Sequence, residues 1–229
     1  MKKAVVVLSG GLDSTVCMSV AKQDGYKIFP ITFSYGQRHS REVEQAKKVA
    51  EFYRCNKHLI LDIGFFREIG ASALTSYNID VPTDRSVEQM QEDIPVTYVP
   101  FRNAVFLSMA VGYAEAIQAE KIYIGVNALD YSGYPDCRPR FIQAFQEAVN
   151  LGTAASDKNM PIKIATPLIS LTKGEIIKVG VKNGAPLHLT TSCYLGGEKA
   201  CGKCDSCRLR LKGFREAGIQ DPIEYEIKD

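Results

Sequence analysis

The chain has 229 residues, 45% of them hydrophobic, and its 28 Lys and Arg residues nearly balance its 26 Asp and Glu residues, for a net charge of +2. A chain of this length fits one large domain, or a domain with an appendage, and it can bury a core without disulfides. So small a net charge creates no field that would attract nucleic acid or a membrane surface, and it favours a small-molecule partner.

Short apolar segments rich in β-branched residues alternate along the chain with longer amphipathic ones. The first, residues 4–8, is too apolar for a sheet with one wet face and predicts a strand buried on both sides. In chain order, strands are predicted at 4–8, 28–35, 57–63, 121–126 and 162–165, and helices at 14–23, 40–52, 103–119, 139–150 and 173–184. Thr172 and Glu175 form a capping box that begins the last helix. The alternation predicts an α/β fold with an open, mostly parallel, Rossmann-like sheet.

Two regions depart from this alternation. Residues 66–97 are long, polar and without a clear period, which is typical of a functional lid or of disorder. Residues 185–229 hold a cysteine cluster and a short tail. We therefore expect an α/β domain at 1–184, with a lid-like insertion near 66–97, followed by a C-terminal appendage at 185–229.

A glycine pair directly follows the first predicted strand, in "VVVLSGGLDS". Ligands of open parallel sheets bind beyond the carboxyl ends of the strands, glycines let backbone N–H groups approach a ligand closely, and a helix start favours an anion. Asp13 can hold a Mg²⁺ ion that contacts phosphate, and the hydroxyls available to phosphate are those of Ser9, Ser14 and Thr15. The alternative, a plain strand–helix turn with an N-cap serine, would be favoured by two glycines alone but not by the whole pattern.

The loop is not of the Walker A type, which needs G-x-x-x-x-G-K-[ST]. The nearest match, residues 197–204, follows no predicted strand and ends in Cys204 rather than in a hydroxyl residue. The Ser9–Ser14 motif instead resembles the pyrophosphatase loop of the adenine-nucleotide α-hydrolase-like superfamily, whose members split ATP into AMP and pyrophosphate while they activate a carbonyl oxygen as an adenylate. The nucleotide-binding segment that this resemblance implies is Leu8, Ser9, Gly10, Gly11, Leu12, Asp13, Ser14, Thr15, Val16, Cys17 and Met18.

Four of the seven cysteines are spaced as metal ligands. Cys193, Cys201, Cys204 and Cys207 form C-x7-C-x2-C-x2-C, and two-residue gaps let successive thiolates converge on one ion. We expect one structural Zn²⁺, with neighbouring Lys and Arg side chains offsetting its thiolate charge. A four-iron cluster is the alternative, although the usual ferredoxin run continues to a Cys before Pro that is absent here.

The remaining cysteines are scattered and are expected to be core or neutral residues. The apolar run of "MKKAVVVL" is too short for a signal peptide, and no stretch approaches the length of a membrane span. We therefore expect a cytoplasmic protein without a membrane partner, in which disulfides are rare.

Polar clusters follow other predicted strands. After the second strand, "SYGQRHSRE" offers Gln37, Arg38 and His39 for phosphate or substrate contact, although His39 fits a helix start equally well. In "VPFRN", Arg102 can grip a carboxylate or phosphate through its fork of donors, and Asn103 follows it. A solvated helix-cap arginine is the alternative, which Arg102 alone would favour.

A glycine–proline turn follows the fourth predicted strand, in "NALDYSGYPDCRPRF". Asp130, Tyr131 and Asp136 gather acceptors and an aromatic plane there, which suits a flat, donor-rich base such as guanine. A surface turn is the alternative, which the concentration of Tyr, Asp and Arg at a strand end disfavours.

Taken together, these clusters resemble one family, the 7-cyano-7-deazaguanine synthases of queuosine biosynthesis. The matching segments are "SGGLDS", "YGQRH", "RNAVFLS", "DYSGYPDCR", "TPLISLTKGE" and "TSCYLGG…ACGKCDSCRLR". The resemblance implies an ATP-dependent ligase that converts 7-carboxy-7-deazaguanine and ammonia into the nitrile, with Mg²⁺ and one Zn²⁺ per chain and a homodimer as the usual assembly. The residues expected at the substrate are Gln37, Asn103, Asp130, Tyr131 and Asp136, and those expected in catalysis are Asp13, Arg38 and Arg102.

The chain departs from the family pattern at several positions. Leu12 stands where many members have Gln, Phe101 stands where many have Gly, and "NALDYSG" replaces the commoner "CETDFSG". These changes bear on contacts to the base and leave the loop glycines, Asp13 and the four thiols intact. Two other functions share these motifs: a tRNA-modifying adenylating enzyme, which would need a basic face, and a nucleotide-binding zinc module that senses ATP without catalysis.

Overall fold

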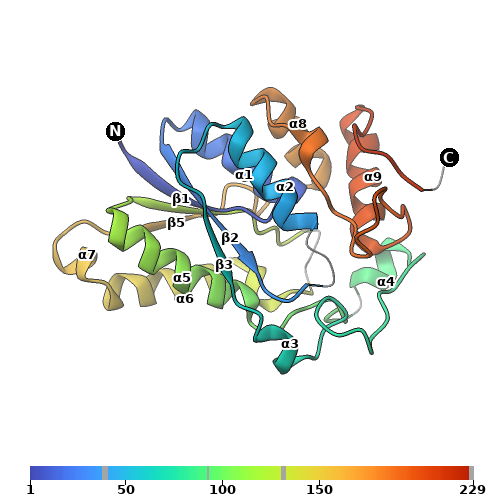
Figure 1. The fold of residues 1–229 in the computed structure, drawn as a ribbon, viewed down its shortest axis with the longest axis horizontal. Helices are drawn as coiled ribbons and strands as arrows, with labels where there is room; N and C mark the ends of the chain where they lie inside the picture. The colour runs from blue at the N-terminus through green and yellow to red at the C-terminus, as the bar shows by residue number, and fades with distance from the viewer. Residues whose placement is uncertain (38–40, 92, 130–132, 227–229) are drawn as a thin grey trace.

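The computed structural model describes residues 1–37, 41–91, 93–129 and 133–226, and its centre is an all-parallel sheet of five strands (Figure 1). The strand order is β3-β2-β1-β4-β5. The strands are β1 (Lys3–Val7), β2 (Lys27–Ser34), β3 (Leu59–Asp62), β4 (Lys121–Ile124) and β5 (Lys163–Ala165). Val5 pairs with Phe29 on one side and with Ile122 on the other, so β1 lies at the centre. The predicted α/β fold with an open parallel sheet is confirmed.

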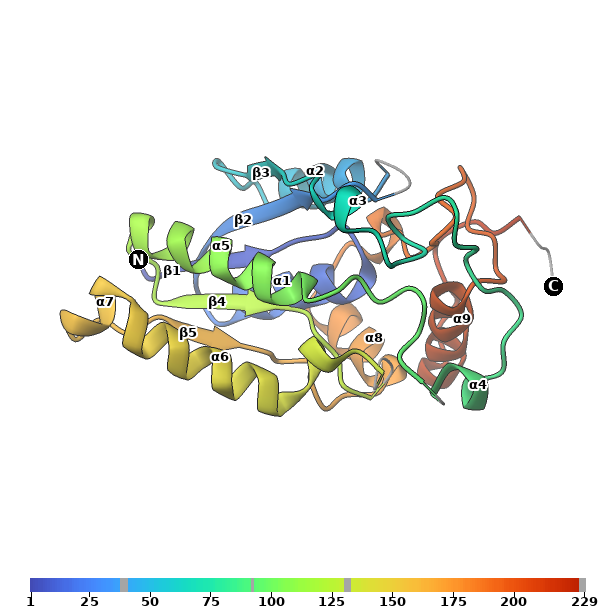
Figure 2. The ribbon, with the colours of Figure 1, turned by 90° about the horizontal axis from the view of Figure 1, so that it is seen from below.

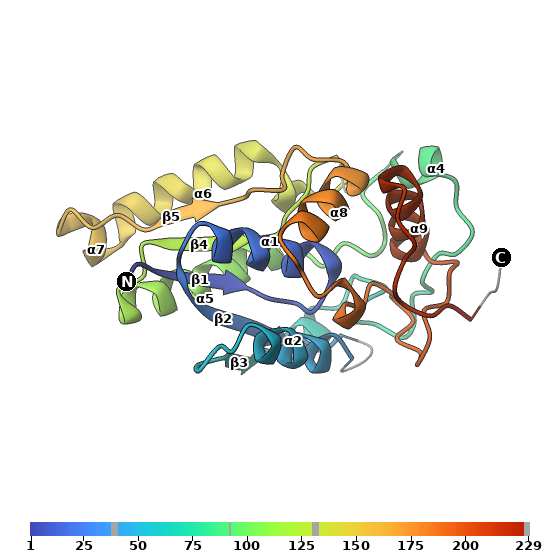
Figure 3. The same ribbon diagram turned by 90° about the horizontal axis from the view of Figure 1, so that it is seen from above.

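Helices cover both faces of the sheet. Helices α1 (Leu12–Gln23), α2 (Arg41–Phe52) and α8 (Lys173–Lys182) lie over one face, which Figure 3 shows. Helices α5 (Arg102–Ile117) and α6 (Pro139–Gly152) lie over the other, which Figure 2 shows. Successive β1 side chains point to opposite faces, so that Ala4 and Val6 join one apolar core and Val5 and Val7 the other. This two-sided burial explains why the first strand is apolar throughout.

The predicted capping box of α8 is confirmed. The Thr172 hydroxyl accepts a hydrogen bond from the Glu175 backbone N–H at 3.3 Å, and the Glu175 carboxylate accepts one from the Thr172 N–H at 2.8 Å. These two bonds begin the helix at Lys173, which places that lysine in the first turn.

Several helices were not predicted. They are α3 (Phe66–Ile69), α4 (Val87–Gln91), the 3₁₀ turn η1 (Pro135–Cys137), α7 (Ala154–Asp157), the 3₁₀ turn η2 (Leu187–Leu189) and α9 (Asp205–Ala217). In α9, four Arg and Lys residues interrupt the apolar pattern, and Cys204 rather than a typical capping residue precedes the helix. The helix lies beside α8 at the carboxyl end of the strands (Figure 3).

The segment 66–97 packs against the cysteine segment. Ala73 and Val81 share a small apolar core with the four clustered cysteines. Thr83 forms an isolated antiparallel bridge with Cys204, and the Arg85 guanidinium forms an ion pair with Asp205 at the start of α9. The division of the chain at residue 184 stays a prediction. No helix in the described ranges is long and apolar enough to cross a membrane.

Candidate active site

A cavity opens at the point in the sheet where the connections between strands change from one face to the other. After β1 the chain crosses to β2 through α1 on one face, whereas after β4 it crosses to β5 through α6 on the opposite face. The carboxyl ends of β1 and β4 therefore border a crevice, and open α/β sheets bind their ligands in such a crevice. The cavity is lined from β1 by Val7 and Ser9 and from β4 by Ile124, Gly125 and Asn127.

The glycine loop after β1 is tightly hydrogen-bonded. The Ser9 and Ser14 hydroxyl oxygens lie 3.0 Å apart, the Ser9 N–H donates to Ser14 Oγ at 3.2 Å, and the Gly11 N–H donates to Ser9 Oγ at 3.2 Å. Gly11 is the N-cap of α1 and, as a glycine, offers no side chain to cap the helix start. The N-terminal dipole of α1 therefore faces the cavity, where an anion is favoured.

The nucleotide-binding segment divides into two groups of residues. Those that line the cavity are Ser9, Gly11, Leu12, Asp13 and Ser14. Those that are buried away from its wall are Leu8, Gly10, Thr15, Val16, Cys17 and Met18. Val16, Cys17 and Met18 belong to the core between α1 and the sheet, so their contribution is to hold the loop in place.

Gly10 has no room for a side chain. Its φ of +82° lies in the left-handed region, and an added Cβ would meet the Glu42 carbonyl oxygen at 2.2 Å and the Ala46 nitrogen at 2.7 Å. We expect Gly10→Ala to separate α2 from the loop and to lower the free energy of unfolding by at least about 1–2 kcal/mol, the usual cost of a left-handed non-glycine residue. Urea unfolding measures this loss, and unchanged stability would contradict the close packing. Gly25→Ala is the control for strain alone, since Gly25 has a φ of +81° and nothing within 4 Å of the added Cβ.

Asp13 is bound by a lysine from a distant part of the chain. Lys173 Nζ donates to both Asp13 carboxylate oxygens at 2.8 Å, and the Lys173 side chain is 8% exposed. The sequence analysis did not single out Lys173. A signal was present: a lysine at the first position of a helix opposes the positive end of the helix dipole, so a functional partner has to be sought for it. The pair places one cation and one carboxylate directly beside the phosphate-binding loop.

Arg102, the first residue of α5, contacts two neighbouring aromatic rings with its guanidinium. Its guanidinium carbon is 5.2 Å from the Tyr35 ring centroid and 5.7 Å from that of Phe106, and Nη1 donates to the Tyr35 hydroxyl at 3.1 Å. Burial acts to lower the pKa of Arg102, but the neighbouring Tyr35, Tyr134 and acidic side chains outweigh it and raise that pKa. The guanidinium therefore stays charged and lines the cavity from the side opposite α8.

Asn103 and Asp136 bind each other. Asp136 Oδ2 accepts a hydrogen bond from the Asn103 backbone N–H at 2.9 Å, and the Asn103 amide donates to Cys137 Sγ at 3.2 Å. Burial raises the pKa of Asp136, which is 3% exposed. Asn103 lines the cavity. Asp136 does not line it and instead accepts the hydrogen bond that caps the start of α5. Asp136 thereby holds Arg102 and Asn103 in place.

Gln37 is turned back onto the turn that follows β2, where its side-chain oxygen accepts a hydrogen bond from the Tyr35 N–H at 2.8 Å. Arg38, His39, Asp130 and Tyr131 lie outside the described residues, so their places in the site remain predictions. Several lining residues were not anticipated, because they come from segments far apart in the sequence. They are Tyr35, Glu42, Leu74, Phe106, Tyr134, Lys173, Tyr194, Ser206 and Arg210.

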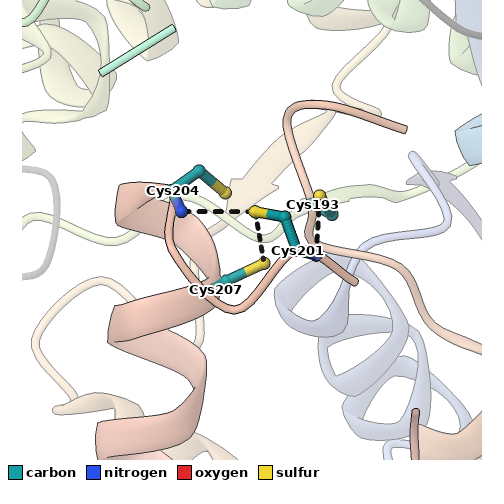
Figure 4. A group of neighbouring side chains, drawn as sticks. All are labelled: Cys193, Cys201, Cys204 and Cys207. Atoms are coloured by element: carbon teal, nitrogen blue, oxygen red, sulfur yellow. Dashed lines mark hydrogen bonds between the residues drawn. The ribbon is translucent and has the colours of Figure 1, made fainter. Parts of the chain in front are cut away.

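The four predicted metal ligands meet in one cluster, as Figure 4 shows, and the neighbouring Tyr194 and Ser206 line the cavity. Their sulfur atoms all lie within 4.8 Å of one another, with Cys201 Sγ and Cys207 Sγ 3.9 Å apart. Tetrahedral zinc with Zn–S bonds of about 2.3 Å separates its sulfurs by about 3.8 Å. The cluster has room for a single ion rather than for several irons with their bridging sulfides.

The thiols of this cluster are buried and lie close to one another. Hydrogen bonding with the Cys193 sulfur raises the pKa of Cys204 to about 12, so these thiols resist ionising together unless a cation is bound. The basic residues expected to offset the thiolate charge are Lys199, Lys203, Arg208 and Arg210, and that offset stays a prediction. Three of them also have carboxylate partners. Arg210 binds both Asp221 oxygens at 2.7 and 2.9 Å. Lys199 lies 3.1 Å from Glu224, and Arg208 lies 3.9 Å from Asp84.

Comparison with known proteins gives a match along nearly the whole chain. A family model described as "Queuosine biosynthesis protein QueC" matches residues 3–218. A 7-cyano-7-deazaguanine synthase of Acetivibrio thermocellus is 61% identical over 225 residues, which cover 98% of each chain. Proteins of the same name from Oceanobacillus iheyensis and Picrophilus torridus are 59% and 54% identical, with 98% and 99% of this chain covered and 98% and 92% of theirs.

Proposed function

Because this chain belongs to the QueC family of queuosine biosynthesis proteins, we propose that it is a ligase that converts 7-carboxy-7-deazaguanine and ammonia into 7-cyano-7-deazaguanine with ATP. The observation that carries the proposal is the cavity at the carboxyl ends of β1 and β4. It joins the Ser-Gly-Gly loop, the Asp13–Lys173 pair and the Arg102 guanidinium in one site. The first two groups suit a nucleotide, and the third suits the carboxylate of the acid substrate.

The atoms of the reaction require two activations. A carboxylate has two oxygens and a nitrile has none, and neither oxide nor hydroxide leaves readily at neutral pH. The carboxylate therefore attacks the α-phosphate of ATP, pyrophosphate leaves, and ammonia displaces AMP to form the amide. The amide oxygen then attacks a second ATP in the same way. Loss of that AMP together with the two amide protons forms the nitrile.

The phosphates are placed on the α1 side of the cavity. Backbone N–H groups at the start of α1, with the Ser9 and Ser14 hydroxyls, face the phosphate oxygens. Lys173 neutralises charge on the departing pyrophosphate. To do so, its ammonium group leaves the Asp13 carboxylate and contacts the phosphate oxygens. The freed Asp13 carboxylate, with the Ser14 hydroxyl, is the type of oxygen donor that Mg²⁺ prefers. A bound Mg²⁺ supplies further neutralisation of the phosphates.

The acid substrate is proposed to lie on the Arg102 side of the cavity. Arg102 binds its carboxylate, and contacts with Tyr35 and Phe106 hold the guanidinium in position. Asn103 contacts the substrate directly, Asp136 supports it, and Gln37, Arg38, Asp130 and Tyr131 remain proposed contacts. The family's cysteine cluster holds one structural Zn²⁺ in this proposal. The enzyme is further proposed to be cytoplasmic, to act without binding nucleic acid and to form a homodimer.

The test follows the oxygen atoms. With acid substrate labelled with ¹⁸O in both carboxylate oxygens, ATP, Mg²⁺ and ammonium, we expect two AMP and two pyrophosphate per nitrile, each AMP with one label, and the amide as an intermediate. Mass spectrometry of AMP and of the 7-deazaguanine products measures the label, the amide and the ratio of AMP to nitrile, and a pyrophosphate assay gives the remaining ratio. ADP and phosphate, or unlabelled AMP, would contradict the mechanism. AMP formed only with a tRNA substrate would point to an RNA-modifying enzyme, and ATP binding without AMP formation to a sensor.

A further inference from the structure

Helix α9 presents a glycine to the stem of Lys173. An alanine Cβ at Gly213 would lie 2.3 Å from Lys173 Cγ, 2.8 Å from Lys173 Cβ and 3.0 Å from Ile177 Cδ1. We propose that Gly213 is a positioning residue: its missing side chain leaves the space in which Lys173 extends from α8 to the Asp13 carboxylate. The expected effect on turnover rests on the proposed function, whereas the packing of Gly213 against Lys173 does not depend on it.

The space cannot be recovered by turning a side chain. Lys173 Cβ is fixed by the α8 backbone, so its 2.8 Å approach is relieved only if a helix moves. The Cγ atom can turn away by a change of the χ1 rotamer, but that change directs the rest of the side chain away from Asp13. The start of α8 is itself held by the Thr172–Glu175 capping box. Two turns further along the same helix, a Cβ at Gly180 would lie 2.7 Å from Val16 of α1. Helix α8 is therefore closely packed on α1 as well as on α9, and it has little space in which to shift.

Helix α9 is anchored as firmly. Cys204 precedes the helix and Cys207 lies in its first turn, both within the metal-binding cluster. Asp205 is paired with Arg85 of the 66–97 segment. The buried Arg210 donates to Asp221 and to the Thr190 hydroxyl at 2.7 Å each. The cysteine segment thus reaches the ATP side of the site through one face of α9, which carries Ser206, Arg210 and Gly213.

The decisive variant is Gly213→Ala in the full-length protein. Displacement of a reacting group by about 1 Å can cost about 10²-fold in rate, so we expect turnover to fall about 30- to 100-fold. The KM for the acid substrate should stay within twofold, because Lys173 faces ATP. Metal content should be unchanged. The matched control is Gly112→Ala in α5, where an added Cβ has nothing within 4 Å, and it should keep full turnover.

A double-mutant cycle separates positioning from general damage. Lys173→Ala removes the Cγ and the ammonium group whose position an alanine at 213 would change, although the 2.8 Å approach to Cβ of residue 173 remains. If Gly213 acts on turnover through the ammonium group, Gly213→Ala should lower turnover by less than about twofold in that background. If the loss of turnover in the double variant equals the product of the losses in the two single variants, the inference is wrong. Full activity of Gly213→Ala would also overturn it. Crystal structures give a readout that does not depend on the reaction. The 2.8 Å contacts between Lys173 and Asp13 should be lost in Gly213→Ala, and their retention would refute the proposal even if the substrate were another acid.

Discussion

Asp13→Asn is expected to lower turnover by about 10²–10³-fold, the usual range for loss of one preorganised charge contact to a transition state. The carboxylate faces the cavity at the start of α1, and Lys173 Nζ lies 2.8 Å from both of its oxygens. An amide has one acceptor oxygen and no charge, so it both weakens the proposed Mg²⁺ contact and misdirects Lys173. The measurement is AMP release at saturating ATP and Mg²⁺.

Asp13→Asn is also expected to lower the free energy of unfolding, but only moderately. Lys173 is 8% exposed, and an asparagine at position 13 leaves it one neutral acceptor in place of a carboxylate. We expect the free energy of unfolding to fall by about 1–3 kcal/mol, which leaves the protein folded. Asp157→Asn, in the exposed α7 turn, is the matched control and should change neither quantity. Near-normal turnover of Asp13→Asn at high Mg²⁺ would exclude the proposed role.

Cys204→Ser is expected to release the metal and to destabilise the C-terminal segment. Cys204 is fully buried among the other three thiols, it precedes α9, and it bridges to Thr83 of the 66–97 segment. A structural zinc site supplies on the order of 10 kcal/mol, so its loss should unfold α9 together with the insertion packed on it. The measurements are zinc per chain by elemental analysis and hydrogen exchange of α9 amides.

The control for this variant is Cys55→Ser. Cys55 lies outside the cluster at the end of α2 and is half-buried, so the variant should keep one zinc per chain. Purified protein that contains iron and acid-labile sulfide would overturn the assignment of zinc. Unchanged zinc content in Cys204→Ser would show that the four thiols do not form the site.

The sequence predicted the layers of the fold because their signals are local. The apolar run of residues 4–8, the Thr172–Glu175 capping box and the alternation of strand and helix each depend on neighbours within a few positions. Helix α9 was missed for the same reason. Two of its charged residues are paired with a distant segment, Asp205 with Arg85 and Arg208 with Asp84, and no local period reveals such contacts.

By itself the sequence determined which groups carry the chemistry: the Ser-Gly-Gly loop with Asp13, the basic Arg102 and the four closely spaced cysteines. Only the tertiary structure decided how they are used. The order β3-β2-β1-β4-β5 brings β1 beside β4, and α8 then delivers Lys173 to Asp13 across 160 positions of sequence. The tertiary structure also brings Asp136 to the start of α5, which it caps, and packs Gly213 against Lys173. Such pairs depend on strand order and helix packing, which the periodicity of a single segment does not encode.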